Sequence, residues 1–206
     1  ARLGIDRWKL GIGVVLLLLW TLGGLLNWLD QLLLQLDLST LWQGTLLILG
    51  VLLIDMVVDL PLEIRSTFGV ETRFGFNRST PIRFAKDKLI ELALSAAIGL
   101  PLLLLILWLM ESAGDLWWAW AWLAWMGFTL LITWAFPTWI APIFNKFEPL
   151  DQGTLRSRLE NLLYRCGFKS NGMFVMDGSK RSAHGNAYFT GFGKNKRIVF
   201  FDTLLE

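Results

Sequence analysis

The chain is poor in the residues from which catalytic and metal sites are usually built. It has one His, His184, and one Cys, Cys166, among 206 residues. A single Cys excludes a disulfide within the chain. A single His excludes the paired imidazoles of the H-E-x-x-H motif that binds zinc on one helix. We therefore expect no catalytic residue and no metal ligand in this chain.

Charge is also scarce, because 17% of the residues are charged whereas 54% are hydrophobic and 12 are Trp. This composition is typical of a membrane protein rather than of a soluble domain. Apolar runs of roughly 17 to 25 residues are long enough to cross a bilayer. They predict four spans in a mostly α-helical, polytopic protein embedded in the lipid bilayer, at residues 10–26, 45–60, 89–110 and 116–140.

The positive charges are confined to alternate segments. All 19 Lys and Arg lie in the first nine residues, in residues 65–88 or from Lys146 onward. The connections at residues 27–44 and 111–115 contain none. This positive-inside pattern predicts that both ends are cytoplasmic. Attraction to anionic lipid explains the basic excess, so we expect no nucleic-acid partner.

The residues after the fourth span change in character. Pro137 and Pro142 predict a kinked exit. Leu residues at helical spacing over 155–166, followed by Gly167, predict a short amphipathic helix. Three β-rich runs then predict a small sheet. We expect a membrane region at 1–145, with a cytoplasmic loop at 61–88, and a cytoplasmic α+β segment at 146–206. The final Thr203-Leu-Leu-Glu206 has the spacing of a helix capping box.

Two features could carry function, and the residues alone leave both open. Asp55 and Asp59 are four apart in a predicted span and so share a helix face. They reach the interface or pair with Arg65 or Lys88, line a polar chamber, or transfer ions or protons. The run Asn186–Thr190 is either an ordinary paired strand, which its residues favour, or an edge strand on which an extended peptide adds.

Three segments carry a resemblance to a known family: "LPLEIRSTFGVETRFGFNRST", "PTWIAPIFNKFEPL" and "FVMDGSKRSAHGNAYFTGFGKNKRIVFFDTLLE". From about Leu60 to Glu206 the chain resembles the type I CAAX prenyl proteases, in a bacterial-looking version. The resemblance implies a barrel of membrane helices around a water-filled chamber, closed by a peptidase domain. It also implies that the H-E-x-x-H helix follows Glu206, so that the chain is truncated before the zinc site and before a further Glu.

The resemblance implies that the parent is a zinc metalloendopeptidase of the bacterial inner membrane. Its metal polarises the scissile carbonyl and activates water, with a Glu as general base. Its substrate is a peptide or protein, prenylated for eukaryotic members. This chain would supply the membrane anchor, the chamber wall and a substrate strand, while the missing C-terminal half supplies catalysis; alone it would be inactive and bind no zinc. The resemblance assigns peptide binding to four residues: Asn186, Ala187, Tyr188 and Phe189.

His184 precedes that strand, and we expect it to be a turn or cleft residue rather than a zinc ligand. Two alternative functions remain. A non-catalytic membrane module would bind a partner protein through its cytoplasmic sheet. A small transporter would use Asp55 and Asp59, and replacing both with Asn would abolish its ion flux.

Overall fold

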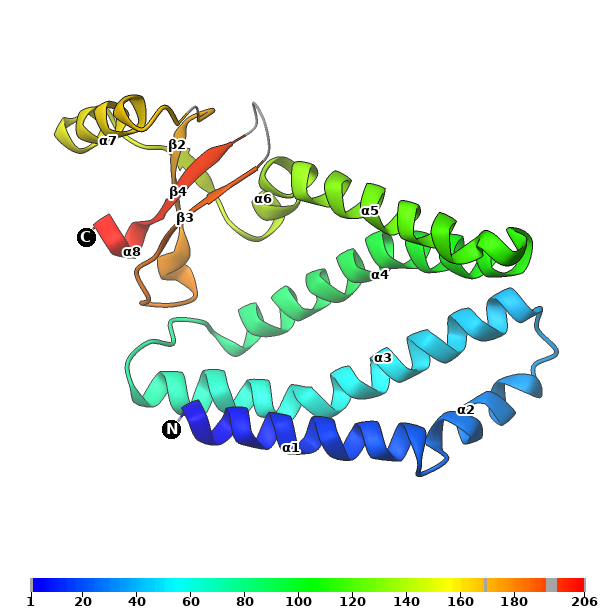
Figure 1. Ribbon diagram of the computed structural model, residues 1–206. Helices are drawn as coiled ribbons and strands as arrows, with labels where there is room; N and C mark the ends of the chain where they lie inside the picture. Colours follow the sequence, from blue (N-terminus) through cyan, green and yellow to red (C-terminus); the bar gives the residue numbers. More distant parts are fainter. Residues whose placement is uncertain (1, 169, 192–195, 206) are drawn as a thin grey trace. The chain divides into compact units, whose positions relative to one another are not determined.

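The computed structural model describes residues 2–168, 170–191 and 196–205, and it is mostly helical (Figure 1). The helices are α1 (Arg2–Thr21), α2 (Leu25–Leu34), α3 (Thr40–Ile64), η1 (Arg65–Glu71), α4 (Pro81–Ser112), η2 (Gly114–Leu116), α5 (Trp117–Ala135), η3 (Phe136–Ile140), α6 (Ala141–Phe144), α7 (Thr154–Arg165), η4 (Gly178–Lys180) and α8 (Asp202–Leu205). The strands are β1 (Phe147–Pro149), β2 (Met173–Met176), β3 (Ala187–Thr190) and β4 (Arg197–Phe201).

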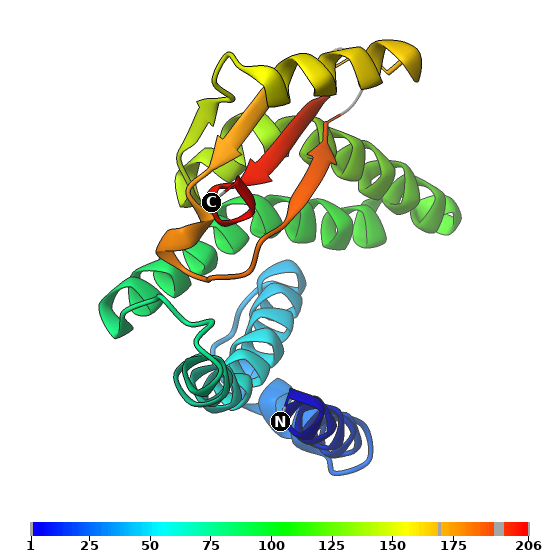
Figure 2. The same cartoon turned by 90° about the vertical axis from the view of Figure 1, so that its left-hand side faces the viewer.

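The chain forms two compact units. One contains Ala1–Gly75 and Leu92–Ala124, and the other contains Phe76–Glu91 and Trp125–Glu206. In the first unit, α1 and α2 pack along α3 (Figures 1 and 2). The second unit holds the sheet and the polar contacts around the loop before β3. The expected division at residue 145, between a membrane region and a cytoplasmic segment, is one of function. The boundaries of the two compact units do not test it, so it stays a prediction.

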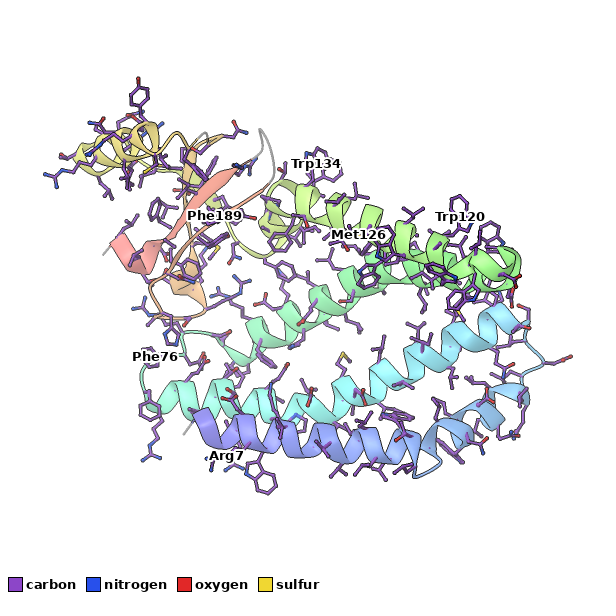
Figure 3. All side chains as sticks on the ribbon, viewed as in Figure 1. Arg7, Phe76, Trp120, Met126, Trp134 and Phe189 are labelled. Carbon is purple, nitrogen blue, oxygen red and sulfur yellow. The ribbon has the colours of Figure 1, made fainter. Side chains whose placement is uncertain are left out.

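Three helical stretches are long and apolar enough to cross a membrane. They are Thr40–Glu71, Pro81–Ser112 and Gly114–Phe144, and the pair Gly4–Thr21 and Leu25–Leu34 becomes a fourth if it is one bent span. The large apolar side chains on these helices are mostly exposed: Trp120 of α5, for example, is 55% exposed (Figure 3). Such surfaces need lipid, so the predicted polytopic membrane fold is confirmed.

The first span differs from the prediction. An unbroken helix was expected over residues 10–26, but α1 ends at Thr21 and α2 begins at Leu25, with a bend of 52° between them. Gly24 causes the break, because its φ of 75° is left-handed and cannot continue an α-helix. Part of the connection expected at residues 27–44 is therefore helical.

The expected loop at residues 61–88 is also shorter than predicted. The helices α3 and η1 continue through Pro61 to Glu71, and Pro81 begins α4. A proline fits the first turn of a helix because its missing N–H needs no partner there. The exit from the membrane region follows the prediction, because the π-helix η3 replaces a regular α-helix at Pro137.

The sheet has the strand order β1-β2-β4-β3. The strands β2 and β4 are parallel, while β1 pairs antiparallel with β2 and β3 pairs antiparallel with β4. Val199, at the centre of β4, is 2% exposed. The strand β1 was not expected, because three residues ending in Pro149 carry no alternating pattern. The three other strands and α7, whose end Gly167 caps with a φ of 64°, follow the prediction.

Two predicted features fall on residues outside the described ranges. The turn expected between β3 and β4 includes residues 192–195, and the capping box includes Glu206. Its other member, Thr203, lies inside α8 and donates its hydroxyl to the carbonyl oxygen of His184 at 2.9 Å. The described half of the box is therefore used to fix the loop before β3.

Candidate functional site

The strand β3 lies at one edge of the sheet. Its only partner strand in the described part of the chain is β4, with Tyr188 opposite Val199 and Phe189 opposite Ile198. The amide of Phe201 donates to the carbonyl oxygen of Asn186 at 2.8 Å, so the hydrogen-bonded positions of β3 are the even-numbered ones. The backbone groups of Ala187 and Phe189 therefore point away from β4. They are where another extended chain would pair.

The side chain of Asn186 closes part of this edge. Its Oδ1 accepts a hydrogen bond from the amide of Ala187 at 2.9 Å. The outward groups left for an incoming chain are the carbonyl of Ala187 and both backbone groups of Phe189. Asn186 thus acts on the edge through its side chain while its backbone stays paired with β4.

Successive side chains of β3 point to opposite faces of the sheet. The Tyr188 hydroxyl donates to Met176 Sδ at 3.8 Å, and its ring meets the ring of Phe201 edge-on. Burial among these residues raises the pKa of Tyr188 above its ordinary value. Phe189 points to the other face and is 72% exposed (Figure 3).

The loop before β3 is fixed by an ion pair that the sequence did not reveal. Arg181 donates from Nε and Nη2 to the two carboxylate oxygens of Asp87, at 2.7 and 2.9 Å, and from Nη1 to Asn145 Oδ1 at 2.7 Å. Arg83 adds a bond from Nη1 to the carbonyl oxygen of Lys180 at 2.5 Å. The bonds to Asp87 raise the pKa of Arg181 further, so the guanidinium stays charged. The start of α4 thereby holds the loop.

His184 lies in this loop, three residues before β3. Its ring stacks on Phe76, with centroids 4.1 Å apart and planes 16° apart, and the amide of Ala183 donates to the carbonyl oxygen of Phe76 at 2.9 Å. The Nε2 atom of His184 is buried and has no hydrogen-bond partner among the described residues. Stacking of the His184 ring on Phe76 therefore fixes the loop, and the Nε2 atom takes no part in these contacts.

Asp202 holds the far side of the same loop. Its carboxylate accepts the amide and hydroxyl of Ser179 and the amide of Thr203. Burial alone would raise the pKa of Asp202, but these hydrogen bonds and the charge of Arg78 outweigh it and lower the pKa. The end of β4 and the start of η4 are thus joined through one carboxylate.

Asp55 and Asp59 lie in the first unit, on α3. Asp55 accepts a hydrogen bond from Trp20 Nε1 of α1 at 3.0 Å, so it faces a neighbouring helix. Asp59 is exposed. Lys88, one of the cations considered as a partner for them, pairs with Glu91 at 2.9 Å. A polar chamber lined by these two acids stays a prediction.

The His, Cys, Asp and Glu side chains of the described residues are not arranged as the ligands of a zinc site. No group of three or more His, Cys, Asp or Glu side chains is gathered within ligand reach in this part of the chain. His184 is held by a stacked ring and Asp202 by backbone amides. What the arrangement offers instead is a free strand edge, fixed at its start by several long-range contacts.

These features define a class before any comparison is made: a polytopic membrane protein whose last third contains a small mixed sheet with β3 at one edge. Two family descriptions match the chain. One, "CAAX prenyl protease N-terminal, five membrane helices", covers residues 1–146, and the other, "Peptidase family M48", covers residues 149–206. The chain belongs to the CAAX prenyl protease family of the M48 peptidases.

Individual relatives agree with this assignment. The chain is 43% identical to CAAX prenyl protease 1 of Saccharomyces cerevisiae over 153 residues, which are 73% of this chain and 33% of that protein. It is 38% identical to the CAAX prenyl protease 1 homolog of Homo sapiens over 164 residues, or 80% of this chain and 34% of the relative. The crystal structure of S. mikatae Ste24p has a TM-score of 0.89 at 32% identity, and covers 98% of this chain and 48% of its own.

The chain thus spans about a third of the length of these curated relatives and about half of the solved structure. The relatives named are eukaryotic, so they give no support to the bacterial version expected from the sequence. That the protein is an integral membrane protein follows from the family and from its helices.

Proposed function

We propose that this chain is the membrane-embedded and substrate-positioning part of a zinc metalloendopeptidase that cleaves prenylated CAAX proteins. The observation that carries the proposal is the free edge of β3 in a chain that belongs to this family. The carbonyl of Ala187 and both backbone groups of Phe189 point outward from that edge. An extended peptide pairs with such an edge through main-chain hydrogen bonds. The substrate strand is therefore Asn186, Ala187, Tyr188 and Phe189.

The residues of this chain hold the peptide rather than cut it. The outward carbonyl of Ala187 and both backbone groups of Phe189 orient the bound chain, while Arg181 and Asp202 keep the preceding loop in place. Holding a reactant in one orientation lowers the entropic part of the barrier. The zinc ligands and the general base would come from residues outside this chain, so we expect these 206 residues to be inactive alone and to bind no zinc.

The membrane sidedness belongs to the same proposal. The confinement of Lys and Arg to alternate segments supports a cytoplasmic position for both ends and for the sheet. Residues 1–145 then serve as anchor and chamber wall, with Asp55 and Asp59 as candidate chamber residues, and residues 146–206 begin the peptidase domain. The prediction of a bacterial inner membrane rests on the sequence resemblance alone.

The first experiment compares the 206-residue chain with the full product of its reading frame. The frame and the intact mass of its product show whether H-E-x-x-H follows Glu206, and each protein is assayed for zinc and for cleavage of a farnesylated CAAX peptide. We expect about one zinc and cleavage for the longer product and neither for the short chain. A frame that ends at Glu206 without zinc would leave a membrane module that binds a partner protein, and the peptidase proposal would fail.

A matched pair of variants tests the strand edge in the longer product. Phe189→Pro removes the outward amide, and an edge strand tolerates a proline at such a position. Phe189→Leu keeps both the amide and an apolar side chain. We expect the Pro variant to lose about tenfold or more in kcat/KM and the Leu variant to change much less. Equal activity of the two variants would show that the peptide does not pair at Phe189.

A further inference from the structure

Phe189 is an unusual residue for the edge of a sheet. Its side chain is 72% exposed, although an exposed aromatic ring on an edge strand invites unwanted pairing. The ring nevertheless has a fixed neighbour: it meets Phe168, just after α7, edge-on at a centroid distance of 6.1 Å. The ammonium of Lys196, the residue before β4, lies over the Phe168 ring, 5.2 Å from its centroid. The two rings form an aromatic ledge, defined here as Phe168 and Phe189.

The backbone of Phe189 determines what reaches this ledge. Because the even-numbered residues of β3 bond to β4, the amide and carbonyl of Phe189 both face outward. A peptide residue that exchanges both hydrogen bonds with Phe189 sits directly opposite it. Side chains directly opposite each other on paired strands point to the same face. The side chain of that peptide residue therefore lies against the ledge.

Asn186 restricts the registers in which a peptide can pair with β3. Its Oδ1 occupies the amide of Ala187, so Phe189 is the described residue of β3 with both outward backbone groups unoccupied by a side chain. A peptide that paired two residues earlier would have to displace this amide bond. The register centred on Phe189 is thus favoured over its neighbour.

We infer that the aromatic ledge of Phe168 and Phe189 is a side-chain subsite, which selects an aromatic or branched apolar residue at the peptide position paired with Phe189. This inference rests on the proposed function and specifies its substrate strand. The occupant is an extended peptide, because outward amide and carbonyl groups require a strand partner and an exposed ring requires an apolar one. Aromatic and β-branched cross-strand pairs stabilise a sheet more than Ala does.

The test measures peptide binding to the 206-residue chain in detergent micelles. The probes are fluorescein-labelled farnesylated CAAX peptides in which each position upstream of the prenylated Cys carries Phe, Val, Ala or Glu in turn. A second series carries a single backbone N-methyl group at each position. At one position, we expect Phe and Val to bind about fivefold more tightly than Ala, and N-methylation of that same residue to weaken binding about tenfold.

Phe189→Ala should then abolish the preference at that position, so that the Phe, Val and Ala peptides bind to this variant with nearly equal affinity. Tyr164→Ala is the matched control, because Tyr164 is an aromatic residue of α7 that is 87% exposed and not part of the ledge. It should leave the preference intact. Both positions are exposed, so neither change should unfold the chain, which circular dichroism checks.

The experiment distinguishes a failure of the subsite from a failure of strand pairing. A preference that survives Phe189→Ala, or that falls on a residue whose N-methylation has no effect, would overturn the subsite while peptide pairing with β3 stands. Binding that no N-methyl group weakens would overturn strand pairing itself, and with it both the proposed function of β3 and the subsite.

Discussion

Arg181 and Asp87 form a two-bond ion pair across 94 residues of sequence, with Nε to Oδ2 at 2.7 Å and Nη2 to Oδ1 at 2.9 Å. Both side chains are largely covered, at 31% and 25% exposure. Two parallel bonds fix the guanidinium in one orientation, which a single-point ammonium does not do. The pair therefore sets where the loop that leads into β3 begins, relative to the first turns of α4.

Arg181→Met should loosen this loop, because it leaves the carboxylate of Asp87 partly buried without its main partner. We expect the amides of Arg78 and Ala183, which bond across this loop, to exchange hydrogen about tenfold faster, or about 1.4 kcal/mol. Hydrogen exchange followed by mass spectrometry measures this change. Adding Asp87→Leu should restore part of the protection. Glu91→Gln, which breaks the exposed ion pair with Lys88, is the control. An equal increase in exchange in that variant would show that the order of the loop does not depend on Arg181.

The hydroxyl of Tyr188 should titrate above its ordinary range. Burial raises the pKa of Tyr188 above 10.0. The chain has two Tyr, so the ultraviolet absorbance of tyrosinate in Tyr164→Phe reports Tyr188 alone. We expect its midpoint to fall toward about 10 when the same variant is unfolded in denaturant.

The raised pKa of Tyr188 also predicts a direction for stability. The unfolded chain loses this proton first, so the folded state is stabilised fully below about pH 10 and progressively less as the pH rises toward the folded pKa. Tyr188→Phe should therefore show a smaller loss of stability than the unchanged chain over that alkaline range. A titration midpoint of Tyr188 that is the same in the folded and unfolded chain would contradict the burial of Tyr188.

Asp202 should stabilise the sheet segment at neutral pH and lose this effect in acid. Its pKa is lowered, so the contribution is present above the unfolded pKa of about 4 and disappears as the pH falls through the folded value. Asp202→Asn should cost about 1 kcal/mol at pH 7, measured by denaturant unfolding in detergent. The cost should shrink at low pH, and a cost that is the same at pH 3 and pH 7 would contradict the lowered pKa of Asp202.

The elements that local sequence predicted are those whose signals lie within a few residues. Gly167 marked the end of α7, Pro137 the irregular exit, and β-rich runs bounded by turn residues marked β2 and β4. The break before α2 was missed because Gly23 and Gly24 stand in a run of Leu whose hydropathy does not change there. A left-handed Gly is visible only in the backbone.

The site needed contacts that no local pattern carries. The free edge of β3 depends on the strand order, which places β4 between β2 and β3. The partners of Arg181 come from α4 and from the start of the sheet segment, and His184 stacks on Phe76 from the connection before α4. The β-rich run Asn186–Thr190 predicted β3 correctly as a strand, whereas the peptide-binding role that the family resemblance assigned to it stays a prediction.

Trp20 should matter to the membrane region through Asp55. The indole Nε1 donates to Asp55 Oδ1 at 3.0 Å, and Trp20 is 7% exposed, so the bond joins α1 to α3 inside the unit. Trp20→Phe keeps most of the ring but removes the donor, and we expect it to cost about 1 kcal/mol in SDS denaturation. Trp28→Phe, at a position 56% exposed, is the control. Asp55→Asn retains the acceptor oxygen and should be tolerated.

The same variants separate a structural acid from a transporting one. If Asp55 serves only to bond Trp20, then Asp55→Asn combined with Asp59→Asn should leave the fold intact and change no ion flux in proteoliposomes. A flux that the unchanged chain supports and the double variant loses would favour the transporter. Asp55 accepts a hydrogen bond from Trp20 of a neighbouring helix, a structural role that needs no ion transfer, so we expect no flux from either protein.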